Sequence, residues 1–245
     1  MDIKGKVIVI TGGSSGLGKA MAIEMVKQGA NVVINGRSEQ ALADAAKEID
    51  PTGKQVRFVA GNIADSKTAQ RLIDEALAHY GRIDTLVNNA GIFMAKPFTE
   101  YSEEDLAVYL STNVVGFFHV TQRAVAQMLK QGTGHIVNIT TSLVDHAIAG
   151  VPSVLASLTK GGIQSATKSL AIEYATKGIR VNAVSPGIIK TPMHPVETHE
   201  GLSSLHPMGR MGESHEIVDA VLYLESAKFV TGEILHVDGG QNAGH

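Results

Sequence analysis

The chain has 245 residues, of which 44% are hydrophobic, a formal net charge of -3 at pH 7 and no cysteine. This length fits one α/β domain over residues 1–245 with an ample core. The weakly negative charge argues against nucleic acid and anionic membranes as partners, and the lack of cysteine excludes disulfides and thiol catalysis. No apolar run has the length of a membrane span, and the first residues do not resemble a signal peptide. We therefore expect a soluble cytoplasmic protein.

Strand and helix patterns alternate along the chain. The strand candidates are Val7–Ile10, Asn31–Asn35, Gln55–Ala60, Thr85–Asn88, His135–Thr140, Arg180–Ser185 and Ile234–Val237. Amphipathic stretches lie between them, such as residues 69–80, whose apolar side chains recur at helical spacing. Helix N-caps are expected at Ser38, Ser66, Ser102 and Ser214. This alternation, with its short connections, predicts a parallel sheet covered by helices on both faces.

The first predicted strand runs into a glycine-rich turn. Gly12, Gly16 and Gly18 have the spacing G-x-x-x-G-x-G, and a helical pattern follows from Lys19. Glycine lets the backbone turn tightly and approach a pyrophosphate, while the free N–H groups at the start of the helix face the anion. Glycine also occurs in plain turns. Its position between an apolar strand and a helix favours a dinucleotide site here.

The end of the second predicted strand bears on the choice of cofactor. NAD sites usually place an acidic residue there, which binds the ribose hydroxyls. Here the strand ends in Asn35-Gly36-Arg37-Ser38, without a carboxylate. The Arg37 guanidinium can bind a 2′-phosphate, with hydroxyls from Ser14, Ser15 and Ser38, although an ordinary solvated arginine is the alternative. We expect NADP(H) to be preferred over NAD(H).

Residues 186–213 interrupt the alternation of strands and helices. The stretch contains Pro186, Pro192, Pro195 and Pro207 together with Gly187, Gly201, Gly209 and Gly212. Long segments of this kind in a compact domain are often functional lids or binding loops. We predict a substrate loop or lid here.

Several segments, in order, resemble the short-chain dehydrogenase/reductase family over essentially the whole chain. They are Thr11–Gly18, Asn88–Gly91, Thr112–Gly116, Ile136–Ser142, Lys160–Gly162, Arg180–Gly187 and Val237–Gly240. The resemblance implies a Rossmann-like doubly wound parallel sheet of seven strands with helices on both faces. It also implies hydride transfer between a nicotinamide and a small ketone, aldehyde or alcohol. Members usually form a tetramer or dimer, and we expect contacts through helices near residues 105–130 and 154–176 and an ordered C-terminal segment, Gly239–His245.

The resemblance also implies the residues of the site. The expected catalytic residues are Asn113, Ser142 and Lys160. Counting from the preceding strand selects Thr141 instead of Ser142, whereas residue type and spacing to position 156 select Ser142. The expected cofactor-binding residues are Gly12, Ser14, Ser15, Gly16, Leu17, Gly18, Arg37, Ser38, Asn62, Ile63, Asn89, Ala90, Gly91, Lys160, Pro186, Gly187, Ile189 and Thr191. We expect no metal ligand among them.

One position departs from the family where the chemistry depends on it most. The family has a tyrosine four residues before the lysine, and here that position is Ala156. The phenol protonates the alkoxide that hydride transfer creates, and losing a general acid typically costs about 10²–10⁴ in rate. Leu158 and Thr159 also differ from the family's usual Ala-Ser, and the segment before Ala156 is slightly longer than usual. These departures favour natural divergence over a single engineered change.

Another group can supply the missing proton. His146 lies in the lengthened loop, Ser153 shares a face with Ala156 if the helix has begun, and a water molecule can occupy the space of the phenol. The sequence therefore predicts an NADP-preferring oxidoreductase with an atypical proton path. Two alternatives remain: a cofactor-binding protein without redox turnover, and a non-redox lyase or dehydratase that uses Ser142 and Lys160.

Overall fold

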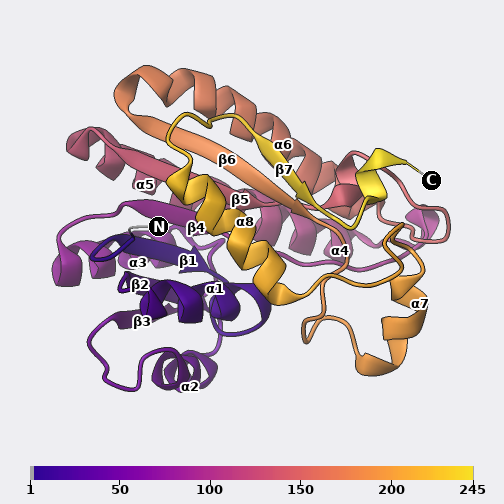
Figure 1. The fold of residues 1–245 in the computed structure, drawn as a ribbon, viewed down its shortest axis with the longest axis horizontal. Helices are drawn as coiled ribbons and strands as arrows, with labels where there is room; N and C mark the ends of the chain where they lie inside the picture. The colour runs from indigo at the N-terminus through magenta and orange to yellow at the C-terminus, as the bar shows by residue number, and fades with distance from the viewer. Residues whose placement is uncertain (1–2, 245) are drawn as a thin grey trace.

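The seven predicted strands form one parallel sheet in the computed structural model, which describes residues 3–244. They are β1 (Val7–Thr11), β2 (Asn31–Gly36), β3 (Val56–Ala60), β4 (Thr85–Asn88), β5 (Gly134–Ile139), β6 (Ile179–Pro186) and β7 (Ile234–Val237). Their order across the sheet is β3-β2-β1-β4-β5-β6-β7 (Figure 1). The fold is therefore the predicted Rossmann-like α/β arrangement, and the predicted strand ends are correct to within a residue or two.

Helices connect the strands and cover the sheet. The α-helices are α1 (Gly16–Lys27), α2 (Glu39–Ile49), α3 (Ser66–Tyr80), α4 (Glu103–Tyr109), α5 (Gly116–Gln131), α6 (Val154–Tyr174), α7 (His199–Ser203) and α8 (Ser214–Ser226). A π-helical segment, η2 (Leu110–Val115), joins α4 to α5. The short 3₁₀ turns are η1 (Phe98–Glu100), η3 (Ser142–Val144), η4 (Ala175–Lys177), η5 (Val196–Thr198) and η6 (Gln241–Ala243). Among these described helices, none is long and apolar enough to cross a membrane.

Two of the four predicted N-caps are confirmed. The Ser38 side chain accepts a hydrogen bond from the Ala41 N–H at the start of α2, and Ser102 forms a capping box with Asp105 at the start of α4. The other two predictions are wrong by one residue, because Ser66 and Ser214 are the first helical residues of α3 and α8. Their caps are Asp65 and Glu213, acidic side chains that suit the positive end of a helix.

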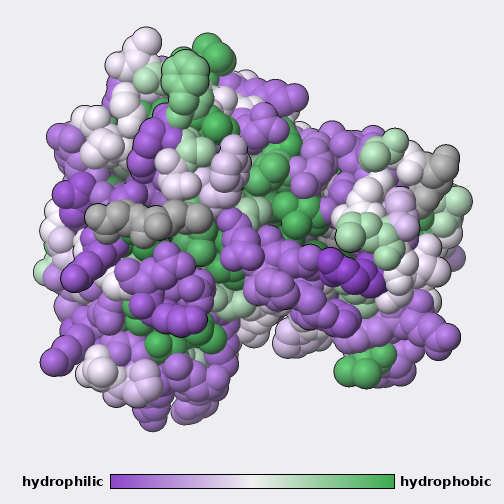
Figure 2. All heavy atoms as spheres, viewed as in Figure 1, coloured by the Kyte–Doolittle hydropathy of each residue, from purple (hydrophilic) through white to green (hydrophobic). Residues whose placement is uncertain are grey.

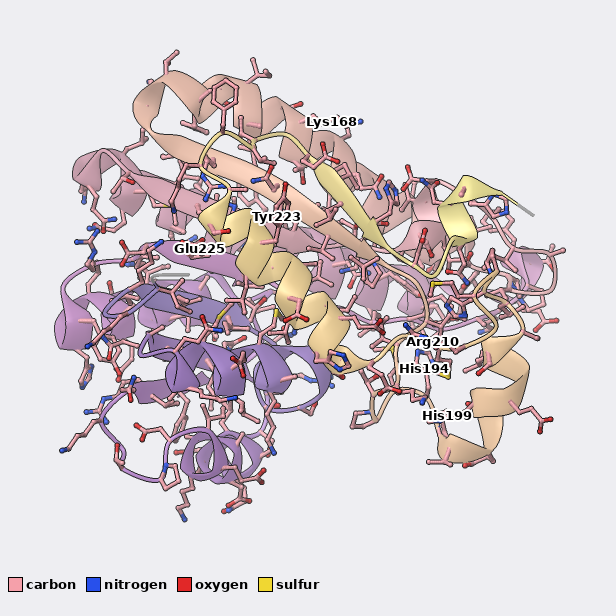
Figure 3. All side chains as sticks on the ribbon, in the orientation of Figure 1. Lys168, His194, His199, Arg210, Tyr223 and Glu225 are labelled. Atoms are coloured by element: carbon pink, nitrogen blue, oxygen red, sulfur yellow. The ribbon has the colours of Figure 1, made fainter. Side chains whose placement is uncertain are left out.

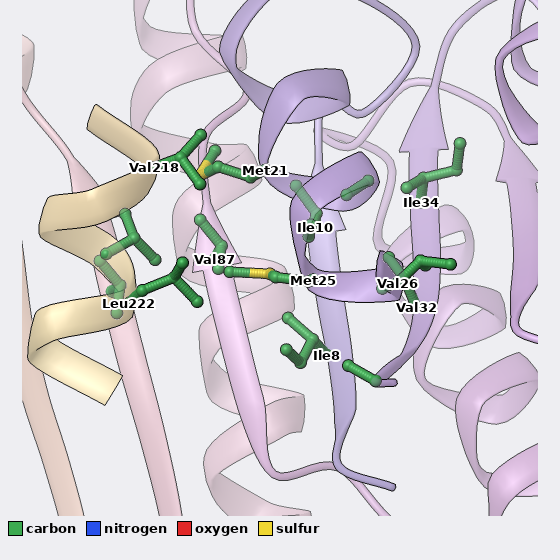
Figure 4. Close-up of a cluster of buried hydrophobic side chains, with 14 of the residues drawn as sticks. Ile8, Ile10, Met21, Met25, Val26, Val32, Ile34, Val87, Val218 and Leu222 are labelled. Carbon is green, nitrogen blue, oxygen red and sulfur yellow. The ribbon is translucent and has the colours of Figure 1, made fainter. Parts of the chain in front are cut away.

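The two faces of the sheet bury separate hydrophobic clusters. Ile8 and Ile10 of β1 pack in the cluster that includes α1, α2 and α8, as the side chains around Met21 and Met25 illustrate (Figure 4). Neighbouring residues on β1 point to the opposite face, where Val9 packs in the cluster that includes α3, α5 and α6. Burial on both faces explains why these strands are continuously apolar rather than alternating.

The strand order reverses direction between β1 and β4. The chain leaves β1 towards β2 on one side and leaves β4 towards β5 on the other, so the loops at their carboxyl ends diverge. Crevices outside the carboxyl ends of strands at such a point are the usual binding sites of open α/β sheets. The glycine-rich turn after β1 and the Asn89–Gly91 turn after β4 both lie there.

The segment predicted as a loop or lid contains more regular structure than expected. Between β6 and α8 it forms η5, α7 and an isolated bridge between Ile189 and Gly212. Figure 1 shows α7 standing apart from the sheet, near the carboxyl ends of the strands and the C-terminus. Figure 2 shows this part as a lobe separated from the main body by a recess.

Candidate functional site

A cavity of about 730 Å³ lies at the reversal of the strand order. It extends from the turns after β1 and β2, past the loop after β4 and the first turns of α6, to the segment after β6. The predicted cofactor-binding residues that line it are Gly12, Ser14, Ser15, Gly16, Leu17, Arg37, Asn62, Ile63, Asn89, Ala90, Gly91, Lys160, Pro186, Gly187, Ile189 and Thr191. The tertiary structure thus brings residues from five loops and from α6 to one place.

The glycine-rich turn has the close contacts that its sequence predicts. Gly12 has φ +70°, and a Cβ on it would lie 3.0 Å from the Ala90 Cα. Gly18 lies outside the cavity lining, where a Cβ would stand 2.2 Å from the Gly12 carbonyl oxygen. The missing side chain of Gly18 lets α1 pack tightly on the turn, as the third glycine of such motifs does, and its contact with the cofactor stays a prediction.

The start of α1 faces the cavity with unpaired backbone groups. Its N-cap, Ser15, forms no side-chain cap hydrogen bond, and the first turn contains no acidic residue. Ser15, Gly16 and Leu17 all line the cavity. The free N–H groups and the positive end of the helix dipole therefore point to a site for an anionic group.

The turns after β1 and β4 are braced against each other. The Asn89 amide donates to the carbonyl oxygens of Thr11 and Gly12, at 3.0 and 3.1 Å. The Thr11 hydroxyl oxygen in turn accepts from the backbone N–H groups of Asn89 and Ala90. This network fixes the two sides of the crevice relative to each other, which a rigid ligand-binding site requires.

Arg37 lines the cavity at the end of β2, with Ser14 close by. A Cβ added at Gly36 would lie 3.1 Å from the Ser14 hydroxyl oxygen, so only glycine fits there without a shift of its neighbour. Ser38 lies outside the lining, and its hydroxyl oxygen accepts the Ala41 N–H as the cap of α2. The prediction that Ser38 binds the cofactor is therefore not supported, because this side chain turns toward its own helix.

Asn113 is buried in the π-helical segment rather than exposed in the cavity. Its Oδ1 accepts from the Ile92 N–H at 3.0 Å, and its Nδ2 donates to the Thr159 hydroxyl at 3.1 Å. One side chain thus connects η2 to the loop after β4 and to α6. π-Turns within helices often occur at functional sites. Asn113 thus holds three elements of the site together, and its catalytic role stays a prediction.

Lys160 points into the centre of the site. Its Nζ donates to the Ile139 carbonyl at 2.7 Å, and only 8% of the residue is exposed. A Cβ added at Gly91 would lie 2.9 Å from the Nζ, so glycine at this position leaves room for the amine. Burial lowers the pKa of Lys160 to about 8.

The structure distinguishes the two candidate hydroxyls after β5. Ser142 is buried outside the cavity lining, and its hydroxyl donates to the Gln241 Oε1 at 2.8 Å. Thr141 lines the cavity, and its Oγ1 accepts the Leu143 N–H at 3.4 Å. Of the two candidate hydroxyls, Thr141 thus faces the cavity and Ser142 does not, since the chain turns into η3 at Ser142 and directs that side chain toward the C-terminal segment.

Ala156 lines the cavity one helical turn before Lys160. It is buried in a small cluster that includes Tyr109 and Leu155. Neither His146 nor Ser153 lines the cavity. The His146 N–H bonds to the Ser142 carbonyl, and Ser153 is the buried N-cap of α6. Neither of these two candidate proton donors is therefore among the residues that line the cavity.

Sequence motifs missed the part of the cavity that lies beyond Lys160. The additional lining residues include Phe93, Val108, Ser111 and His194. They come from the loop after β4, the end of α4, η2 and the predicted lid. Only the lid had a sequence signal, its proline and glycine content, and that signal does not specify which side chains point inward.

Comparison with known proteins identifies the family. The family described as "Enoyl-(Acyl carrier protein) reductase" matches residues 12–242. A curated relative, the 3-oxoacyl-[acyl-carrier-protein] reductase FabG of Thermotoga maritima, is 37% identical and covers 98% of this chain and 99% of its own length.

Solved structures agree with this relationship. A short-chain type dehydrogenase/reductase from Mycobacterium marinum has a TM-score of 0.94 at 30% identity, over 99% of this chain and 98% of its own. ElxO with NADP bound and the 3-ketoacyl-(acyl-carrier-protein) reductase of Brucella melitensis complexed with NADH both have TM-scores of 0.90 at 31% identity. Each covers 98% of this chain and 99% of its own. The fold and cavity are those of a nucleotide-dependent oxidoreductase class. The chain belongs to the short-chain dehydrogenase/reductase family.

Proposed function

We propose that this chain is an NADP-preferring oxidoreductase that transfers a hydride between the nicotinamide and a small ketone, aldehyde or alcohol. The observation that carries the proposal is that Arg37 and Lys160 line the same cavity, one at the end of β2 and the other beside Ala156. The cofactor of the related ElxO structure is NADP, whereas that of the Brucella reductase is NADH. The preference therefore rests on Arg37 and the absence of a carboxylate at that strand end.

The described residues fit a dinucleotide. Gly12 leaves the backbone room to turn toward a pyrophosphate at the start of α1, and Gly18 lets α1 pack closely on that turn. Arg37 and Ser14 would hold a 2′-phosphate, and the Lys160 ammonium would hold the hydroxyls of the nicotinamide ribose. When bound, the nicotinamide supplies or accepts the hydride, and the protein provides orientation and the proton.

The other end of the cavity fits a small carbonyl compound. Phe93, Val108 and Met193 provide apolar walls, which exclude water and accept an apolar substituent. Because the Thr141 Oγ1 accepts the Leu143 N–H, its own proton is free to be donated to a substrate oxygen. Thr141 would thus stabilise the negative charge that forms on that oxygen. The segment over 186–213 would act as the lid, since Thr191–His194 line the same end.

A cofactor-binding protein without turnover is the second candidate, favoured by Ala156 alone. The test follows NADPH absorbance with a panel of small ketones and aldehydes, alongside calorimetric titration with NADP(H) and NAD(H). Oxidation of NADPH that depends on the carbonyl compound supports the oxidoreductase. Binding without oxidation by any compound supports the second candidate, and no binding of either cofactor contradicts both.

The assembly we propose is a homotetramer, or else a dimer. Phe118 of α5 and Leu158 of α6 are exposed apolar side chains, as are Ile172 of α6 and Phe229, between α8 and β7. Helices near residues 105–130 and 154–176 therefore present apolar surface that a second copy of the chain would cover. We also propose a single domain over 1–245 located in the cytoplasm. Met1, Asp2 and His245, including the end of the expected C-terminal contact, lie outside the described residues.

A further inference from the structure

The source of the proton can be sought among the titratable groups that line the cavity. Within the described lining these are Arg37, Lys160 and His194. A guanidinium does not release its proton in the range in which enzymes work. Burial and the neighbouring His199 lower the pKa of His194 below its usual range, so its imidazole is mostly neutral at pH 7. Figure 3 places His194 and His199 together beside α7, on the lobe.

Lys160 has the position that a proton donor needs. It lies one turn after Ala156 on α6, so the two side chains share a helix face, and both line the cavity. An ammonium has three N–H donors, and the Ile139 carbonyl accepts one of them. The Ile139 carbonyl of β5 therefore holds the amine one helical turn from position 156, where the family has the tyrosine whose pKa this lysine lowers. Alanine leaves the space between this amine and the substrate end of the cavity open.

The charge of Lys160 is not neutralised by a carboxylate. No described acidic side chain forms an ion pair with it, and burial is the one cause that lowers its pKa to about 8. Asp145, which follows η3, accepts a hydrogen bond from Gln164 and contacts His236. Asn113 of η2 and its hydrogen-bond partner Thr159 of α6 are both neutral. An amine with a pKa near 8 is mostly protonated at pH 7 and is acidic enough to protonate an alkoxide.

We propose that Lys160 is itself the general acid, and that it passes a proton to the substrate oxygen through one solvent molecule beside Ala156. This inference rests on the proposed reductase function. As the carbonyl carbon receives the hydride, the C=O π pair moves onto oxygen, which takes a proton from the solvent molecule. That molecule takes a proton from the Nζ, and the neutral amine regains one from bulk water. Lys160 thereby combines cofactor binding with the role that tyrosine has elsewhere in the family.

The first test measures the titration of Lys160 without any turnover. The ε-carbon signals of the lysines are followed by ¹H–¹³C NMR between pH 6 and 11, and the Lys160→Arg variant assigns the signal. We expect one lysine to titrate about two units below the ordinary value of roughly 10.4. Lys168 lies on the exposed side of the same helix (Figure 3), so Lys168→Arg should leave that signal in place. A Lys160 signal that titrates with the other lysines overturns the proposal.

The second test separates proton donation from cofactor binding. Lys160→Arg keeps a positive charge and N–H donors, but guanidinium cannot act as an acid near neutrality. We expect kcat/KM for ketone reduction to fall by about 10²–10⁴, while the Kd for NADPH measured by calorimetry changes less than about tenfold. Small primary amines added to Lys160→Ala should restore part of the rate, in an order set by the pKa of each amine. In the parent enzyme, kcat/KM should decline above pH 8.

His194→Gln and Lys168→Arg are the control variants for the kinetics. Both should keep the decline above pH 8, although His194→Gln can change KM because it lines the lid end of the cavity. A decline that disappears in His194→Gln, or a Lys160→Arg variant with the parental rate, overturns the role of Lys160 and leaves the reductase function intact. If the parent fails to oxidise NADPH with every carbonyl compound of the panel, the proposed function is contradicted, and this inference with it.

Discussion

The hydroxyl of Ser142 donates a hydrogen bond to the Oε1 of Gln241, 99 residues later in the chain, at 2.8 Å. Gln241 is fully buried, and its Nε2 donates to the Leu205 carbonyl beyond α7. Ser142 therefore ties the loop after β5 to the C-terminal segment and, through Gln241, to the lobe. This contact gives the serine a structural role, although it is the residue type that family resemblance would choose for catalysis.

Two substitutions should separate the roles of the adjacent hydroxyls. Ser142→Ala leaves a buried Gln241 acceptor unpaired, which should lower the free energy of unfolding by about 1–3 kcal/mol and change kcat/KM little. Thr141→Val removes the hydroxyl in the cavity and should lower kcat by about 10-fold or more, with a smaller change in stability. Urea unfolding and steady-state kinetics measure the two effects. The reverse pattern would assign the catalytic hydroxyl to Ser142.

The Arg37 guanidinium should determine the cofactor preference. Arg37→Ala is expected to weaken NADP(H) binding by about 1.5–3 kcal/mol, the usual contribution of hydrogen bonds to charged groups, and to leave NAD(H) binding nearly unchanged. Calorimetric titration of both cofactors with parent and variant gives the four affinities. Lys19→Ala, on the exposed side of α1 where Lys19 pairs with Glu48, is the matched control for a lost positive charge. Equal losses for both cofactors in Arg37→Ala would rule out a 2′-phosphate contact.

Restoring the phenol should increase the rate of carbonyl reduction. Ala156→Tyr places a hydroxyl between Lys160 and the substrate oxygen, where the adjacent ammonium lowers the pKa of the phenol. The expected gain in kcat/KM reaches at most the roughly 10²–10⁴ of general acid catalysis. Ala156→Phe is the control, because the ring fills the same space without a proton and should lower the rate by blocking the solvent path. If Ala156→Tyr lowers the rate as much as Ala156→Phe, the rest of the site is not arranged around a phenol.

A buried pair at the opposite end of the sheet should make the protein acid-sensitive. Figure 3 shows Glu225 on the far end of α8 from the labelled histidines. His135 Nδ1 lies 2.5 Å from a Glu225 carboxylate oxygen, while its Nε2 faces N–H donors of Asn182 and Arg180. The Nε2 must therefore be an unprotonated acceptor. Burial, the largest cause, lowers the pKa of His135 to about 4.

The sign of the pH effect follows from this depressed pKa. The unfolded chain binds a proton at His135 below about pH 6.5, and the folded chain binds it only near pH 4, so stability is lost as the pH falls between these values. The Glu225 carboxylate adds a loss at lower pH, because its bonds and charges with His135 and Lys6 outweigh burial and lower its pKa to about 2. His135→Gln should flatten the fall in unfolding free energy between pH 6.5 and 4. An unchanged slope in that variant contradicts the assignment.

The proposed assembly depends on exposed apolar side chains of α5 and α6. Light scattering of the parent at micromolar concentration should give the mass of a tetramer or dimer. Phe118→Asp places a charge in the proposed contact and should shift the mass toward the monomer, since an unpaired buried charge is costly. Lys47→Asp, a charge change at an exposed site of α2 outside the proposed contact, should leave the mass unchanged. A monomeric parent would end the proposal.

Periodicity and turn residues in the sequence determined the sheet and its approximate boundaries. The apolar run Val7–Ile10 predicts a strand covered on both faces, and glycine at position 18 is required by its contact with Gly12 in the same turn. These are local consequences of burial and backbone geometry. The same local logic identified the glycine-rich turn at the cofactor end of the cavity, where consecutive residues of one loop act together.

The tertiary structure alone decided which side chains face the reacting end of the cavity. Thr141 and Ser142 are neighbours, and only the turn into η3 and the distant Gln241 determine which of them points inward. Asn113 lies outside the cavity lining because the π-helical segment presents it to Ile92 and Thr159. Each of these orientations depends on a partner from another part of the chain, and a linear sequence specifies residue types without specifying the partners that orient them.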